Sequence, residues 1–280
     1  MLLLLHGGDA RRCAQHPALQ RQAPWLERCW MRCSQPGLWG PCPELDWYSL
    51  DAMGVDGTLA RDDAGFRAAL AGLPPAPADV AARRVFKTHA PWPLFPCAEE
   101  RLDPGTKIVF IARNPKDTCV SLFHHSTGIP AHRYSGDWAH FVDKIFLAGA
   151  SEEGDWFEHT AGWWRAKHTR ACGAQILWLF FEELKADPAR EIRKVADFLG
   201  VDCDDATLER VVAESSFDAM KKGTEAAAPK GAAESTTRFR KGGAGGWRKM
   251  FTDEQSARVD AKYRAKILTL QPKLAFEFGE

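Results

Sequence analysis

The sequence predicts an α/β domain with a central parallel sheet. Apolar runs of strand length lie at 108–112 and 175–181, and Val85-Phe86 with Lys87-Thr88-His89 indicates another strand that ends in polar residues. Segments with helical periodicity or helix boundary signals alternate with these strands. A continuous apolar run is typical of a strand that is buried on both faces of a parallel sheet. We therefore expect a single domain spanning residues 1–280.

Composition places the chain among ordinary globular proteins. Its 280 residues are enough for one large domain with a hydrophobic core, and 45% of them are hydrophobic and 26% charged. Lys+Arg and Asp+Glu both number 37, so no global charge favours nucleic acid or an anionic membrane as a partner. Any attraction for a phosphorylated ligand must therefore be local.

The sequence indicates a cytoplasmic protein with reduced thiols. The apolar opening Leu2–Leu5 is too short for a signal-peptide core or a membrane span. The eight cysteines have no framework spacing, which favours free thiols in a chain of this length. Cys29 and Cys33 would share a helix face close to Cys42, but we favour the interpretation without a metal.

The segment Lys107–His125 is the one around which the other elements are organised. Pro115 suits the first position of a helix that follows the strand at 108–112. Arg113 ends that strand, which puts a cation at the carboxyl edge of the sheet, where open α/β folds bind ligands. Together with Ser121, two helical turns further on, it would suit a phosphate. The alternative is an ordinary strand–helix unit with a solvated arginine.

The remaining elements follow from local signals. Helices are expected near 2–5, 24–31, 59–73, 138–149, 156–170, 188–199 and from 208 onward, with a proline-rich spacer at 74–77 and a mobile, low-complexity loop at 222–237. Pro188 marks a helix start and Gly200 its stop.

Several motifs, taken in this order, resemble the cytosolic sulfotransferase family. They are Lys87-Thr88-His89, Arg113 with Ser121, the segment 179–200, Ser215-Ser216-Phe217 with Met220, and Arg240-Lys241-Gly242 through Trp247. The resemblance runs from about residue 85 to residue 252. It implies a three-layer, P-loop NTPase-like sulfotransferase fold. It also implies an enzyme that moves a sulfonate group from 3′-phosphoadenosine 5′-phosphosulfate (PAPS) to a small alcohol, phenol or amine.

The resemblance implies catalytic roles in the first of these motifs. His89 matches the family's general base, and a neutral imidazole suits the removal of a proton from the acceptor hydroxyl. Lys87 matches the lysine that holds the acceptor oxygen and favours its anionic form. The structural alternative for His89 is a packed histidine at a strand end.

The resemblance also implies a nucleotide site. The matches to the cradle for the 3′-phosphate are Arg113, Ser121, Arg240, Lys241 and the backbone N–H of Gly242, and those around the adenine are Phe181, Ser215 and Phe217. The family usually has tyrosine where Phe181 stands, so a hydroxyl contact is lost while the aromatic face remains. The alternatives are a solvated basic loop at 240–241 and core packing for the two phenylalanines.

Two departures from the family pattern matter. The positions of its dimer element hold Arg248, Thr252, Asp253 and Ala257, so the family-type dimer contact does not carry over. No segment matches the 5′-phosphosulfate loop, of the type Tyr-Pro-Lys-Ser-Gly-Thr-Thr-Trp. We therefore expect a fold that lacks the first strand and this loop, and a chain that begins at the helix after them.

Three functions remain to be compared. The leading one is PAPS-dependent sulfonate transfer. The alternative is an impaired or inactive protein that binds 3′-phosphoadenosine 5′-phosphate (PAP) through the surviving cradle, because loop donors of this kind typically contribute orders of magnitude in rate. A nucleotide kinase is disfavoured, since no G-x-x-x-x-G-K-[ST] sequence occurs. The loops at 90–97 and 222–237 carry no signature of the acceptor.

Overall fold

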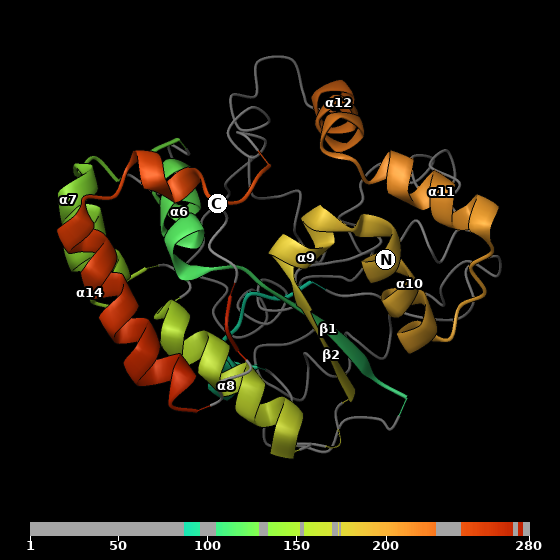
Figure 1. Cartoon of the computed structure of the whole chain (residues 1–280), viewed down its shortest axis with the longest axis horizontal. Helices are drawn as coiled ribbons and strands as arrows, with labels where there is room; N and C mark the ends of the chain where they lie inside the picture. Colours follow the sequence, from blue (N-terminus) through green and yellow to red (C-terminus); the bar gives the residue numbers. More distant parts are fainter. Residues whose placement is uncertain are drawn as a thin grey trace, which may run out of the picture.

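Two parallel strands lie at the centre of the part of the chain that the computed structural model describes, which is residues 87–95, 105–128, 134–151, 154–169, 173, 175–227, 242–270 and 274–276. They are β1 (Lys107–Ala112) and β2 (Gln175–Phe180), and they pair from Lys107 opposite Gln175 to Ala112 opposite Phe180. Figure 1 shows helices on both sides of this pair. The two strands end level with each other, so the residues that follow them emerge at the same edge.

The alternation of side chains along the strands explains the layers. Ile108, Phe110 and Ala112 belong to one hydrophobic cluster, whereas Val109 packs against a second one. β2 alternates in the same way, with Trp178 in the first cluster and Leu179 in the second. Side chains on both faces of the strands therefore pack in hydrophobic clusters, as the continuous apolar runs predict, except at Ile111, which is 52% exposed. The architecture is an α/β fold with a parallel sheet.

The helices divide between the two faces. The first cluster is formed largely by α6 (Pro115–Gly128), α7 (Trp138–His140) with the π-helix η5 (Phe141–Phe146), α8 (Trp156–Thr169) and α14 (Asp253–Tyr263) with the π-helix η8 (Arg264–Leu268). The second is formed by α10 (Pro188–Leu199) and α11 (Asp205–Glu214). The short elements are η3 (Trp92–Leu94), α9 (Phe181–Ala186) and η7 (Gly246–Lys249), and α12 (Phe217–Ala227) follows α11.

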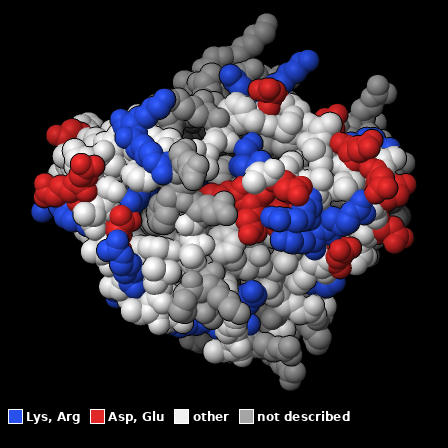
Figure 2. Space-filling view, viewed as in Figure 1, with Lys and Arg blue, Asp and Glu red and all other residues white. Residues whose placement is uncertain are grey.

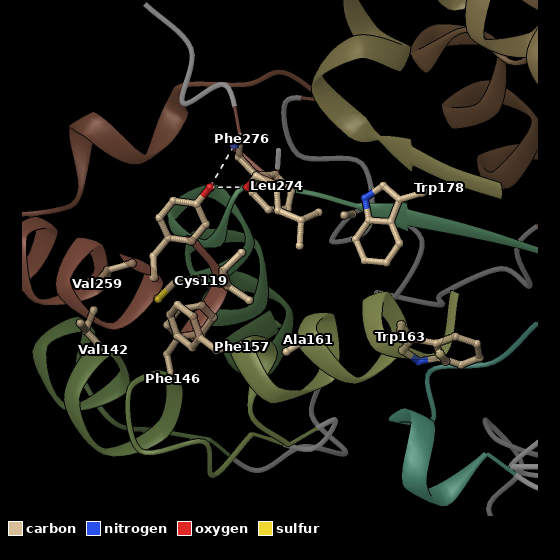
Figure 3. Packing of buried hydrophobic residues seen from close by; sticks show 14 of the residues in the cluster. Cys119, Val142, Phe146, Phe157, Ala161, Trp163, Trp178, Val259, Leu274 and Phe276 are labelled. Carbon is tan, nitrogen blue, oxygen red and sulfur yellow. Dashed lines mark hydrogen bonds between the residues drawn. The ribbon is translucent and has the colours of Figure 1, made fainter. Parts of the chain in front are cut away.

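The larger cluster is rich in aromatic side chains (Figure 3). Phe157 is fully buried and Trp163 is 2% exposed. The C-terminal segment is fastened to this cluster by the hydroxyl of Tyr263, which donates to the carbonyl oxygen of Leu274 at 2.5 Å and accepts the N–H of Phe276 at 3.1 Å. The ring of Phe276 in turn packs edge-on against Phe180, the last residue of β2.

Local signals predict the helix boundaries well. α6 begins at Pro115. α10 begins at Pro188, where Asp187 accepts the N–H of Arg190, and it ends at Gly200 with φ 66°. A positive φ favours glycine, which has no β-carbon to clash with the backbone. The strand expected through residue 181 ends one residue earlier, because Phe181 begins α9.

One expected helix is confirmed only in part, and one expected loop is wrong. The helix expected over 138–149 is α-helical only to His140 and continues with wider turns, in which Leu147 donates to Val142 and Ala150 to Ile145. The loop expected from residue 222 is helical as far as Ala227, because the strong helix former alanine outweighs the low complexity of the sequence.

Other expectations fall outside the described residues. They concern every element before residue 87, including the strand at 85–86, and the loop from residue 228 onward. Within the part that the structure describes, no helix has the length and apolar character needed to cross a membrane. Charges of both signs are interspersed on the face shown in Figure 2.

Candidate functional site

The site is built where the two strands end. Arg113 directly follows β1 and Phe181 directly follows β2, and the register of the strands brings them level. The guanidinium of Arg113 lies over the Phe181 ring, 4.6 Å from its centroid. Its Nη2 donates to the carbonyl oxygen of Gly243 at 2.8 Å. One arginine therefore joins the sheet edge to a segment 130 residues later in the chain.

That segment, Gly242–Trp247, is called the glycine segment below. Gly242 and Gly245 have φ values of 62° and 79°, which side chains other than glycine rarely adopt. The ring of Phe217 lies against Gly242, where an added β-carbon would stand 2.8 Å from Cε2 and 3.0 Å from Cγ. The first residue of α12 and the glycine segment are therefore in direct contact.

A buried carboxylate fixes the glycine segment. Asp117 accepts the N–H of Gly245 at 2.7 Å through Oδ2 and the N–H of Trp247 at 3.0 Å through Oδ1. Asn114 donates through Nδ2 to Asp117 at 2.9 Å and to Glu182 Oε1 at 2.8 Å. Backbone N–H of Asn114 also donates to Glu182 Oε1 at 2.8 Å. The ends of β1 and β2 are thus tied to each other and to the segment.

A buried lysine supports the same segment from the other side. Lys116 is 4% exposed and its Nζ lies 2.8 Å from Asp260, on α14. It also donates to Ser256 at 2.7 Å and lies 4.2 Å from the centroid of the Trp247 ring. The start of α6 therefore holds the glycine segment through two adjacent residues.

The sequence reasoning did not identify Asn114, Lys116, Asp117 or Glu182. A polar run directly after a buried strand is the signal that singles out the first three, although it does not reveal their partners. Glu182 follows the aromatic Phe181 and is 5% exposed. A nearly buried carboxylate of this kind needs hydrogen-bond donors, and Asn114 supplies two of them to Oε1.

The predicted catalytic pair lies in a separate segment. Lys87 and His89 are both exposed. The backbone of His89 and Ala90 is held from α8, where Trp163 Nε1 donates to the carbonyl oxygen of Ala90 at 3.0 Å and His159 Nε2 lies 3.2 Å from that of His89. The position of the His89 main chain is therefore fixed by a buried indole and a second histidine.

The remaining predicted residues differ in their placement. Ser121 is exposed on α6. Ser215 is the C-cap residue that follows α11, and its hydroxyl donates to the carbonyl oxygen of Val211 at 2.6 Å. Arg240 and Lys241 lie outside the described residues, directly before Gly242. The structure thus brings together Arg113 and Phe181, and Gly242 and Phe217, with Gly243 joining the two pairs.

This arrangement suits an anion attached to a flat ring. A guanidinium and the backbone of a glycine-rich turn are groups that bind phosphates. The aromatic faces of Phe181 and Phe217 suit a heterocycle. The described residues at this edge of the sheet therefore carry the kinds of group that bind nucleotides.

The chain is similar to known sulfotransferases. The family model described as "Sulfotransferase domain" matches residues 2–271. Sulfotransferase 1A1 of Bos taurus is 35% identical over 204 residues, which cover 71% of this chain and 67% of that protein. Sulfotransferase 1C2 of Oryctolagus cuniculus is 36% identical over 270 residues, covering 95% and 76%. The chain thus spans about two thirds to three quarters of the length of these relatives.

A solved structure supports the same assignment. The mouse sulfotransferase SULT7A1 complexed with PAP aligns with a TM-score of 0.60 and 30% identity, over 74% of this chain and 70% of that chain. Since the family model covers nearly the whole sequence and the relatives exceed 30% identity, the chain belongs to the sulfotransferase family.

Proposed function

We propose that this protein transfers the sulfonate group of PAPS to a hydroxyl or amine of a small acceptor. The observation that carries the proposal is the contact of Arg113 with both Gly243 and the Phe181 ring. This contact joins a phosphate-binding cation, a glycine-rich turn and an aromatic face at one sheet edge. A nucleotide with a 3′-phosphate has complementary groups, and the mouse relative named above holds PAP.

The proposed nucleotide contacts combine this geometry with the resemblance to the sulfotransferase family. Arg113 and the Gly242 backbone bind the 3′-phosphate, with Ser121, Arg240 and Lys241 as further members of the cradle. Phe181 and Phe217 pack on the adenine, and Ser215 lies beside it. Support comes from the Phe217 ring against Gly242, which couples the adenine side to the phosphate side.

The reaction is an in-line displacement at sulfur. A lone pair of the acceptor oxygen or nitrogen forms the new bond to sulfur, while the bond from sulfur to the 5′-phosphate oxygen breaks and PAP leaves with its electrons. The acceptor proton passes to His89. Lys87 holds the acceptor atom. The fixed backbone around His89 supports this role, because a general base acts only within hydrogen-bond reach of the proton.

Two further features belong to the proposal. The protein forms a single sulfotransferase domain over residues 1–280 and is located in the cytoplasm. Both parts of the proposal rest on the resemblance to the cytosolic family. The acceptor is proposed only as a small molecule bearing an alcohol, phenol or amine.

The test combines binding with transfer. The 280-residue chain is titrated calorimetrically with PAP and with adenosine 5′-phosphate, and labelled sulfonate transfer from PAPS is measured on a panel of one phenol, one alcohol and one arylamine. We expect PAP to bind more tightly than adenosine 5′-phosphate and at least one acceptor to be sulfonated. A version extended before Met1 by a strand and a Tyr-Pro-Lys-Ser-Gly-Thr-Thr-Trp loop is assayed beside it.

Each outcome has a distinct meaning. PAP binding without transfer by either version supports the binding-only alternative. Transfer by the extended version alone shows that the chemistry needs the added loop. A folded chain that binds PAP and adenosine 5′-phosphate with equal affinity overturns the proposed site.

A further inference from the structure

Asp117 carries a carboxylate that contacts the glycine segment, which is itself proposed to bind a phosphate. Asp117 is 2% exposed, and both of its carboxylate oxygens accept backbone N–H groups of the glycine segment. By charge alone, a carboxylate close to a phosphate weakens phosphate binding. Any favourable contribution of Asp117 to nucleotide binding must therefore come from the position it imposes on its neighbours.

The contacts show what Asp117 positions. It holds the glycine segment at Gly245 and Trp247, while Arg113, four residues earlier in the chain, holds it at Gly243. Both of these residues, Arg113 and Asp117, come from the junction of β1 and α6. The held segment includes Gly245, whose φ is 79°. A free glycine-rich chain adopts positive and negative φ values about equally readily, so glycine alone does not favour this conformation.

Asp117 is itself held in place. Asn114 Oδ1 accepts the backbone N–H of Asp117 at 2.8 Å, and Asn114 Nδ2 donates to the carboxylate. Asn114 is fully buried and is bound in turn to Glu182 at the start of α9. The carboxylate therefore has one well-defined position relative to both strand ends.

We propose that Asp117 is a positioning residue for the nucleotide site: its carboxylate keeps the glycine segment in the conformation that receives the 3′-phosphate before any ligand binds. This inference rests on the proposed function. The gain is one of preorganisation, because a segment that is already ordered loses less entropy when the ligand binds.

The first experiment needs no variant. Amide hydrogen exchange is measured on the ligand-free chain, and the amides of Gly245 and Trp247 are compared with that of Ala244, an exposed residue of the same glycine segment. We expect protection at the first two, because each donates to a buried carboxylate. Free exchange at both amides in the folded protein overturns the proposal.

The second experiment separates position from charge. Asp117→Asn removes the charge and leaves at most one good acceptor for two N–H groups, whereas Asp117→Glu keeps the charge and displaces it. Asp218→Asn, at the exposed start of α12, is the matched control for loss of one negative charge near Phe217. PAP and adenosine 5′-phosphate are titrated against each variant at one salt concentration.

We expect both Asp117 variants to bind PAP about tenfold more weakly, with a change of less than about threefold for adenosine 5′-phosphate. The control should bind PAP as the parent does, or slightly more tightly. Tighter PAP binding by Asp117→Asn indicates that charge dominates and overturns the proposal. Equal losses for both nucleotides indicate a general structural role and also overturn it.

Failure of the proposed function is recognised separately. A parent chain that is folded and shows no PAP affinity overturns the function and the ligand part of this inference. If the parent chain binds PAP and both Asp117 variants bind PAP as tightly as the parent does, this inference alone is overturned.

Discussion

The ring of Phe217 occupies the space that a β-carbon on Gly242 would need. The two residues lie on either side of a segment of the chain that includes residues 228–241, and their contact joins the first turn of α12 to the glycine segment. Because both residues belong to the proposed nucleotide site, a change at one of them alters the surroundings of the other. In the proposed site, the contact therefore couples the side assigned to adenine to the side assigned to the 3′-phosphate.

Gly242→Ala is expected to damage both stability and binding. The methyl group meets Cε2 and Cγ of Phe217 at 3.0 Å or less, and the φ of 62° is unfavourable for alanine. We expect a loss of about 1–3 kcal/mol in the free energy of unfolding and a loss of PAP affinity by calorimetry. Gly243→Ala is the control, since its β-carbon would meet nothing within 4 Å. Equal effects of the two substitutions would contradict the packing argument.

Arg113→Lys is expected to weaken PAP binding while keeping the charge. Lysine cannot reproduce the planar fork that reaches Gly243 or the stacking on Phe181. A charge-assisted hydrogen bond typically contributes about 1.5–3 kcal/mol, so we expect PAP affinity to fall by about one order of magnitude or more. Calorimetry with adenosine 5′-phosphate, which lacks the 3′-phosphate, should show a much smaller change. A proportional loss for both ligands argues against a 3′-phosphate role.

His89→Ala tests the proposed base. If His89 takes the acceptor proton, turnover in an active form of the protein should fall by about two to four orders of magnitude, with PAP affinity nearly unchanged. His140→Ala is the control, because His140 is an exposed histidine that contacts Tyr134 instead. Near-normal turnover of the His89 variant, measured as labelled sulfonate transfer, rules out this role.

The pair Lys116–Asp260 is expected to stabilise the fold more than an exposed pair does. Lys116 has a side chain that is 5% exposed, against 51% and 49% for the pair Lys266–Glu158. A double-mutant cycle with Lys116→Met and Asp260→Asn should give a coupling of about 1–3 kcal/mol. The same cycle at the exposed pair should give about 0.2–1 kcal/mol. Urea unfolding measures both, and equal couplings would show that burial has no influence here.

Tyr263 gives a prediction about pH. Burial raises the pKa of its phenol, so the folded protein holds this proton more tightly than the unfolded chain does. The resulting stability is fully present below the unfolded pKa of about 10 and is lost as pH rises through the higher folded value. Tyr263→Phe leaves the Leu274 carbonyl and the Phe276 N–H without this partner, which should cost about 1–3 kcal/mol.

The measurement compares the two proteins over a range of pH. The stability difference between the parent and Tyr263→Phe should shrink as pH rises from about 9 to about 11. Because both proteins carry all the other titrating groups, the difference isolates Tyr263. A difference that stays constant or grows with pH contradicts the assignment.

The sequence by itself determined the local structure and the family. Pro115, Pro188 and Gly200 mark helix boundaries because proline and glycine restrict or free the backbone at a single residue. The apolar runs predicted β1 and β2 because strands that pack on both faces carry apolar side chains at successive positions, although Ile111 remains 52% exposed. The order of the motifs indicated the sulfotransferase family, which the match over residues 2–271 confirms.

Only the tertiary structure decided which polar groups meet. Asp117 reaches Gly245 across 128 positions and Arg113 reaches Gly243 across 130. Periodicity and propensity describe neighbours along one element, whereas these bonds depend on where a distant loop returns to the sheet edge. A buried carboxylate and an exposed one look alike in sequence. What distinguishes Asp117 is the set of N–H groups that folding brings to it, since burial without those donors would be unfavourable.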